Sequence, residues 1–269
     1  ESFYLVSAGA FQRLDHDWIY KWMPKDYSVQ FENLTNSIGV LVIAGPKSRD
    51  LISKISSTTD FTNQSFPWLS SKKIDVNLAP SIAIRMNFVG ELGWELHHPI
   101  EYQNHIFDSL IEAGKEFNIK PFGIRAMDSL RIEKSYKLVG TEMSIEYAAM
   151  ESGLDRFVHL NKGEFIGRDA LVKWQQDGFK NKFVTLEVKN VTDADALGNN
   201  PIYNGKEVIG RATGGNYGFR VQKSLALGMV KPEFSKVGTM LKMDILGTMY
   251  DVEVIQDSPY DPENKLIRI

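Results

Sequence analysis

Two carboxylates flank a glycine in the stretch Val-Gly-Glu-Leu-Gly-Trp-Glu-Leu, which covers residues 89–96. If this stretch is extended, the two-residue period of a strand puts Glu91, Gly93 and Glu95 on one face and the apolar residues between them on the other. A flat polar ligand could then approach the backbone at Gly93 and offer N–H groups to the acids. A solvated edge strand with ordinary surface glutamates has the same pattern and is the commoner case, so the spacing alone leaves both interpretations open.

The other residues that often carry chemistry form no recognisable site. The five histidines include no metal-ligand spacing such as HExxH, and a strand would point the adjacent His97 and His98 to opposite sides. The absence of cysteine excludes a disulfide, a thiolate metal site and a cysteine nucleophile. No GxGxxG fingerprint or serine elbow occurs, and residues 210–218 lack the Lys-Ser/Thr pair of a phosphate loop. We therefore predict no metal site, no nucleotide-binding fold, and a cluster of β-turns at residues 210–218.

The composition is that of a packed globular protein. The chain has 269 residues, of which 43% are hydrophobic and 11% aromatic, enough for one large or two ordinary domains. Its 31 basic and 34 acidic side chains give a net charge of −3, which disfavours nucleic acid and anionic membranes as partners. No apolar run approaches the roughly 20 residues of a membrane span, and no signal-peptide pattern opens the chain. We expect a soluble protein of the cytoplasm, or of the mitochondrial matrix in a eukaryote.

The hydrophobic periodicity indicates an α+β part followed by a β part. The predicted strands are residues 3–7, 29–33, 40–43 and 81–88, and the predicted helices are residues 16–23, 46–52, 99–114 and 122–136. Residues 163–174 are expected to form a turn followed by a short helix. On the fourth helix Arg125, Asp128 and Arg131 are spaced at three and are expected on a solvated face. From residue 182 short strands alternate with turns, and Asn204-Gly205 between two apolar runs is a strong hairpin signal.

Six motifs follow one another in the order typical of folate-binding aminomethyltransferases. They are Gly45-Pro46, residues 89–96, Ala126-Met-Asp-Ser-Leu-Arg-Ile-Glu-Lys134, Glu151-Ser-Gly-Leu154, Phe165-Ile-Gly-Arg-Asp-Ala170 and Tyr260-Asp-Pro-Glu-Asn264. The chain resembles this family, whose type member is the glycine cleavage T-protein, over nearly its whole length. It is most similar to the C-terminal part of dimethylglycine and sarcosine dehydrogenases.

The resemblance implies a fold with two domains. Residues 1–177 would form a folate-binding α+β region, with antiparallel sheets and flanking helices, whose N-terminal part is missing. Residues 178–269 would form a C-terminal β-barrel. Tetrahydrofolate would lie in a central cavity.

The resemblance also implies a set of cofactor-binding residues. A glutamate of the family's GxxGxE motif binds the pterin, and Glu95 matches it; a carboxylate suits the paired N–H donors of an aminopyrimidine edge. Glu91 and Trp94 are expected to shape the pocket. Arg156 follows the motif at residues 151–154, in a stretch that approaches folate in dimethylglycine dehydrogenase, and Tyr260 lies near the tyrosine contact of the T-protein.

Two departures from the family pattern concern the folate and catalytic residues. Met127 stands where the T-protein has a folate-binding arginine, and Arg125 lies two positions earlier, a rotation of roughly 200° on a helix. The catalytic aspartate of the family lies in an N-terminal hairpin that should precede Glu1. The catalytic residue is therefore unknown for this chain, which we expect to be a piece of a longer protein or one subunit of an assembly.

The activity that the resemblance implies is folate-dependent one-carbon transfer. An FAD-containing domain upstream, or a partner flavin dehydrogenase subunit, would oxidise an N-methyl amine to an iminium, and this part would capture the one-carbon unit on tetrahydrofolate. Holding the reactants together would avoid release of formaldehyde. The alternatives are a non-catalytic regulatory or scaffold relative, which the missing aspartate favours and Glu95 disfavours, and a free-standing aminomethyltransferase acting on a lipoyl carrier.

Overall fold

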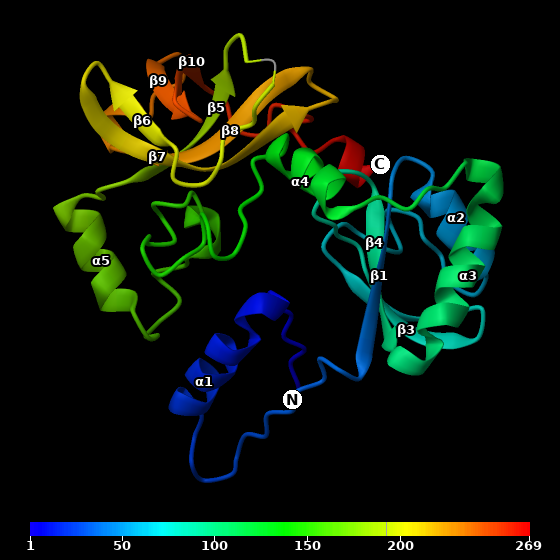
Figure 1. Ribbon diagram of the computed structural model, residues 1–269. Helices are drawn as coiled ribbons and strands as arrows, with labels where there is room; N and C mark the ends of the chain where they lie inside the picture. The colour runs from blue at the N-terminus through cyan, green and yellow to red at the C-terminus, as the bar shows by residue number, and fades with distance from the viewer. Residues whose placement is uncertain (192) are drawn as a thin grey trace. The chain divides into compact units, whose positions relative to one another are not determined.

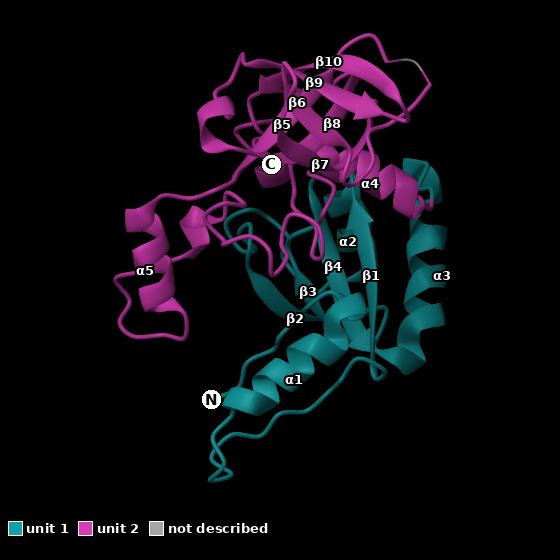
Figure 2. Ribbon diagram, turned by 60° about the vertical axis from the view of Figure 1, so that its left-hand side comes forward, with its two compact units in different colours: residues 1–87, 92–120 teal, residues 88–91, 121–269 magenta. Residues whose placement is uncertain are grey.

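The structure is a computed structural model that describes residues 1–191 and 193–269. The chain folds into two compact units (Figure 2). Unit 1 comprises Glu1–Asn87 and Leu92–Lys120, and unit 2 comprises Phe88–Glu91 and Pro121–Ile269. No helix in the described part of the chain is long and apolar enough to cross a membrane.

Unit 1 is a four-stranded antiparallel sheet with α2 and α3 packed on one face (Figure 1). The sheet has the order β1-β4-β3-β2. Its elements are α1 (Gln12–Trp22), β1 (Ile38–Ala44), α2 (Ser48–Ile55), β2 (Ser71–Val76), β3 (Ala79–Ile84), β4 (Gly93–Pro99) and α3 (Gln103–Gly114). Apolar residues at helical spacing, Leu51 and Ile55 of α2 and Ile106 and Leu110 of α3, enter one core with the sheet.

The side chains of the inner strand β4 alternate between the two faces of this sheet. Trp94 and Leu96 are fully buried in the core, whereas Glu95 and His97 alternate with them on the face away from it. The predicted alternation is confirmed for these residues. Glu91 is the exception, because β4 begins only at Gly93 and Glu91 lies in the bend before the strand.

Unit 2 is built around a closed antiparallel barrel (Figure 1). The barrel order is β10-β5-β8-β7-β6-β9. The helices of unit 2 are α4 (Ile124–Ile132) and α5 (Arg168–Asp177). The barrel strands are β5 (Lys182–Val188), β6 (Pro201–Asn204), β7 (Glu207–Gly218), β8 (Lys223–Val230), β9 (Met240–Ile245) and β10 (Thr248–Ile255). The Ser129 hydroxyl of α4 donates to the Tyr217 carbonyl of β7 at 2.6 Å, and Ile132 packs on the barrel strands. The predicted fold class, antiparallel α+β followed by a C-terminal β-barrel, is confirmed.

Several local predictions are wrong. Residues 3–7 and 29–33 are irregular rather than strands, because alternation alone supplies no neighbouring strand to pair with. Residues 210–218 belong to β7 and are not a turn cluster. A Cβ at Gly210 would lie 2.3 Å from the Met229 carbonyl of β8, so glycine is needed there for close strand approach.

The predicted solvated face of α4 is also wrong in part. Arg131 is buried, at 3% exposure, and its Nε donates to Asp128 at 2.7 Å. Ile124, an apolar residue in the first turn of the same helix, is instead 77% exposed. The spacing of these residues is helical as predicted, but a paired arginine can occupy the buried face because its charge is satisfied there.

Gly93 permits the close approach of β1 and β4. A Cβ at this position would lie 2.3 Å from the carbonyl oxygen of Ile43. The space beside Gly93 is thus filled by the backbone of β1. The sequence-based expectation that a flat ligand approaches the backbone at Gly93 is wrong.

We expect Gly93→Ala to lower the free energy of unfolding by about 1 to 3 kcal/mol, because β1 must shift to admit the methyl group. Urea denaturation measures this change. Gly9→Ala is the control, since nothing lies within 4 Å of its added Cβ, and its effect should stay within about 0.5 kcal/mol. Equal stability of the two variants would contradict the close approach of the strands.

Candidate functional site

Glu95 lies in the middle of the sheet of unit 1, on the face away from the helices. The strand register places Val42 of β1 and Ile84 of β3 directly beside it. The Glu95 side chain is 21% exposed and that of Val42 is also accessible. A carboxylate between two aliphatic side chains can accept hydrogen bonds from the edge of a flat ligand while the ring contacts apolar surface.

A buried histidine holds the Glu95 carboxylate. His97 lies two residues further along the same face of β4, and its Nε2 is 3.2 Å from Glu95 Oε2. Its Nδ1 is 3.0 Å from the hydroxyl of Tyr4, whose ring meets the imidazole edge-on. Burial, and after it the negative charge of Glu95, raise the pKa of Tyr4. The hydroxyl therefore keeps its proton at neutral pH.

Trp94 supports this strand from the opposite face. Its ring is fully buried and packs edge-on against Phe61 and Phe66. Its Nε1 has no hydrogen-bond partner within residues 1–191 and 193–269. The side chain is thus part of the apolar core.

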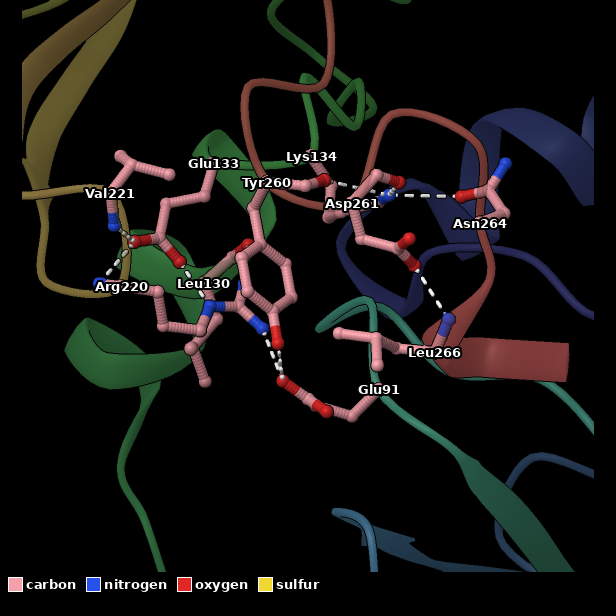
Figure 3. A network of polar contacts seen from close by, with 10 residues as sticks. All are labelled: Glu91, Leu130, Glu133, Lys134, Arg220, Val221, Tyr260, Asp261, Asn264 and Leu266. Atoms are coloured by element: carbon pink, nitrogen blue, oxygen red, sulfur yellow. Dashed lines mark hydrogen bonds and ion pairs between the residues drawn. The ribbon is translucent and has the colours of Figure 1, made fainter. Parts of the chain in front are cut away.

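A second polar network, in unit 2, joins two of the predicted site residues (Figure 3). Glu91 Oε1 accepts hydrogen bonds from Arg220 Nη1 at 2.7 Å and from the Tyr260 hydroxyl at 2.9 Å. The Arg220 guanidinium also lies over the Tyr260 ring, 3.7 Å from its centroid. Burial and the hydrogen bond to Glu91 raise the pKa of Tyr260. Glu91 and Tyr260 are therefore held together by an arginine that the sequence did not indicate.

Glu133, at the end of α4, anchors the same arginine. Arg220 Nε donates to Glu133, and the backbone N–H groups of Arg220 and Val221 donate to its Oε1 at 2.7 and 3.2 Å. The Glu133 side chain is 0% exposed. A fully buried carboxylate is tolerated here because a cation and backbone donors satisfy it together.

Lys134 fixes the backbone that carries Tyr260. Its Nζ donates to the carbonyls of Tyr260 and Asp261 at 3.0 and 2.7 Å and to Asn264 Oδ1 at 2.9 Å (Figure 3). Burial lowers the pKa of this lysine. Gly90 has φ +73°, and a Cβ there would lie 2.4 Å from the Lys134 stem, so both its backbone and its packing favour glycine.

The two remaining predicted residues lie outside these networks. Arg125 is exposed on the first turn of α4. Arg156 is exposed, and its guanidinium lies over the ring of Phe157, 4.6 Å from the centroid. Both are cations available to an anionic group.

The sequence did not indicate Arg220, Tyr4 and His97 as partners of the candidate site residues. Arg220 meets partners 87 and 129 residues away, and Tyr4 meets His97 across 93 residues, so no local spacing could reveal either contact. For His97 the sequence suggests only a possible metal ligand, and it lacks the spacing of one. The described residues contain no cluster of three or more histidine or acidic side chains that could hold a metal ion.

We expect Arg220→Met to lower the free energy of unfolding by roughly 3 kcal/mol or more, because it leaves the buried Glu133 without its cation. The control is Lys242→Met, which breaks the exposed 2.7 Å pair with Asp251 and should cost less than about 1 kcal/mol. Urea denaturation compares the two variants. Similar losses would show that Arg220 acts as an ordinary surface charge.

Two family models match the chain. Residues 1–162 match the GCVT N-terminal domain, and residues 181–261 match the glycine cleavage T-protein C-terminal barrel domain. The chain is similar in fold to the crystal structure of glycine cleavage system aminomethyltransferase T from Bartonella henselae. The TM-score is 0.79 at 18% identity, covering 94% of this chain and 67% of that one.

Two groups of relatives are similar to the chain in sequence. Human mitochondrial dimethylglycine dehydrogenase is 38% identical over 258 residues, which cover 95% of this chain but only 29% of that protein. An aminomethyltransferase of Thermoanaerobacter sp. (strain X514) is 30% identical over 274 residues, which cover 98% of this chain and 71% of the relative. The family models and these relatives agree, and the chain belongs to the glycine cleavage T-protein family of aminomethyltransferases.

Proposed function

We propose that the chain binds tetrahydrofolate and serves as the one-carbon transfer part of an N-methyl amine-oxidising enzyme similar to dimethylglycine and sarcosine dehydrogenases. The observation that carries the proposal is the position of Glu95. This acid matches the family's pterin-binding glutamate and lies partly exposed at the centre of a sheet face. It has His97 as its only hydrogen-bond partner in the described part of the chain, and its other oxygen is left for a ligand.

The chemistry of this site fits the aminopyrimidine edge of a pterin. That edge presents two adjacent N–H groups, and a carboxylate accepts such a pair through charge-assisted hydrogen bonds. The aliphatic side chains of Val42 and Ile84, on either side of Glu95, suit the faces of a planar ring. Glu95 would hold and orient the ring, and tetrahydrofolate when bound supplies the N5 nucleophile that captures the one-carbon unit.

The other predicted site residues take supporting parts in this proposal. Trp94 would stabilise the strand that carries Glu95, since it is buried in the core. Glu91 and Tyr260 belong to the network around Arg220 within unit 2, and their part in folate binding rests on the family resemblance alone. Arg125 and Arg156 are exposed cations of unit 2, and their part in folate binding likewise rests on the family resemblance alone. The catalytic residue stays unassigned, and the division of the chain after residue 177 stays a proposal.

The flavin step is proposed from the relatives. The chain spans about 29% of the length of the dimethylglycine dehydrogenases it matches. FAD would be held by another domain or by a partner subunit, which would pass on the one-carbon unit of an N-methyl amine. A free-standing aminomethyltransferase is the second candidate, favoured by the match to 71% of the Thermoanaerobacter relative; the higher identity to dimethylglycine dehydrogenase favours the first.

We expect Glu95→Gln to weaken tetrahydrofolate binding by about 1.5 to 3 kcal/mol, because it replaces an acceptor-only carboxylate with an amide. This corresponds to roughly 10- to 100-fold in the dissociation constant. Calorimetric titration with tetrahydrofolate kept reduced under nitrogen measures the change, and circular dichroism checks the fold.

Glu101→Gln is the matched control, since this exposed glutamate lies just after the same strand and its replacement should leave the affinity unchanged. A folded parent chain that does not bind tetrahydrofolate would contradict the proposal and favour the scaffold alternative. Equal affinity of the parent chain and Glu95→Gln for tetrahydrofolate would show that the pterin binds at another site.

A further inference from the structure

Tyr4, His97 and Glu95 form a continuous chain of hydrogen bonds in unit 1. The Tyr4 hydroxyl is 3.0 Å from His97 Nδ1, and His97 Nε2 is 3.2 Å from Glu95 Oε2. The His97 side chain is only 2% exposed. The register places Val40 of β1 and Ile82 of β3 on either side of it. The imidazole thus has aliphatic neighbours across the sheet and one polar partner at each nitrogen.

The partners of the imidazole determine where its proton lies. An uncharged imidazole has one N–H donor and one acceptor nitrogen, and a carboxylate has acceptor oxygens only. Nε2 must therefore carry the proton that is donated to Glu95. Nδ1 is then the acceptor, and the Tyr4 hydroxyl must donate to it. The raised pKa of Tyr4 agrees with a hydroxyl that keeps its proton.

The neighbouring histidine provides a contrast within the same strand. His98 points to the other face, where its Nδ1 is 2.9 Å from the Leu96 carbonyl oxygen and its Nε2 is 2.9 Å from Gln103 Oε1. The Leu96 carbonyl can only accept, so in an uncharged His98 it is Nδ1 that carries the proton, and the Gln103 amide turns to offer its N–H group to Nε2. Adjacent histidines are thus held in opposite proton arrangements, and the partner of each ring is the cause.

We propose that Tyr4 and His97 are positioning residues that hold the Glu95 carboxylate as a fixed hydrogen-bond acceptor for a ligand edge with two N–H donors. The proposal rests on the proposed function of Glu95. His97 restrains one oxygen, so the carboxylate does not have to be ordered when the ligand arrives. Tyr4 acts one step further away, because its hydrogen bond to Nδ1 holds the orientation of the ring that donates to Glu95.

The first test observes the proton arrangement and needs no ligand. Nitrogen-15 correlation spectra of the imidazole groups should show the Nε2–H form for His97 and the Nδ1–H form for His98. In Tyr4→Phe, which removes only the hydroxyl, the Nδ1 signal of His97 should shift because this nitrogen loses its hydrogen-bond donor, whereas the His98 signals should be unaffected. An Nδ1–H form of His97 in the parent chain, or an unchanged spectrum in Tyr4→Phe, would overturn the proposal.

The second test is a double-mutant cycle of tetrahydrofolate binding. Tyr4→Phe should weaken binding about 3- to 10-fold, the effect of one hydrogen bond. In the Glu95→Gln background the same change should have almost no effect, because Tyr4 acts through that carboxylate. Tyr27→Phe, at a tyrosine that is 92% exposed in the same unit, is the control.

The outcomes separate this inference from the proposed function. A parent chain that does not bind tetrahydrofolate overturns both. Binding that depends on Glu95 but not on Tyr4 overturns the positioning role alone. An equal loss from Tyr4→Phe in both backgrounds would show a general structural effect and also overturns it. A loss seen only with Glu95 present, together with the expected spectra, supports the proposal.

Discussion

The antiparallel register of β1 and β4 is the constraint on which the candidate site depends. It pairs Ile43 with Trp94 and Val42 with Glu95. A slip by one residue would turn Trp94 outward and drive Glu95 into the core. Burying an aromatic side chain of this size is worth about 4 kcal/mol by area, so the tryptophan opposes the slip strongly. The close contact of Gly93 with β1 also opposes a slip of the register, because a residue with a side chain would not fit there.

A different constraint organises unit 2. Glu133 is fully buried at the end of α4. It joins this helix end to the turn between β7 and β8, which carries Arg220. The Arg220 side chain then contacts Glu91 and Tyr260. Lys134 holds the loop of residues 260–264 through hydrogen bonds to three of its oxygen atoms. Buried charges of this kind add little net stability compared with apolar packing. Their effect here is positional, because each donor fixes a separate segment of the chain.

The sequence predicted the fold class and the face of the strand on which Glu95 lies, because both depend on patterns that are local or ordered along the chain. Glu95 stands out by strand alternation and by a family motif, and the hairpin at Asn204-Gly205 follows from turn chemistry. Arg220 and the pair of Tyr4 and His97 could not be predicted in this way, because their contacts join distant segments.

The errors have physical causes of the same kind. Residues 3–7 alternate like a strand but have no strand to pair with, and the glycines of β7 resemble turns although they admit the backbone of β8. Arg131 has the spacing of a surface charge and is nevertheless buried beside Asp128. Alternation and spacing describe one segment, whereas pairing and burial depend on what lies against it.

The most direct measurement is a crystal structure of the chain with tetrahydrofolate bound. We expect the 2-amino group and the N3 atom of the pterin within hydrogen-bond distance of the Glu95 carboxylate, with His97 still in contact with its Oε2. A pterin bound elsewhere, with no contact to Glu95, would contradict the proposed role of this glutamate.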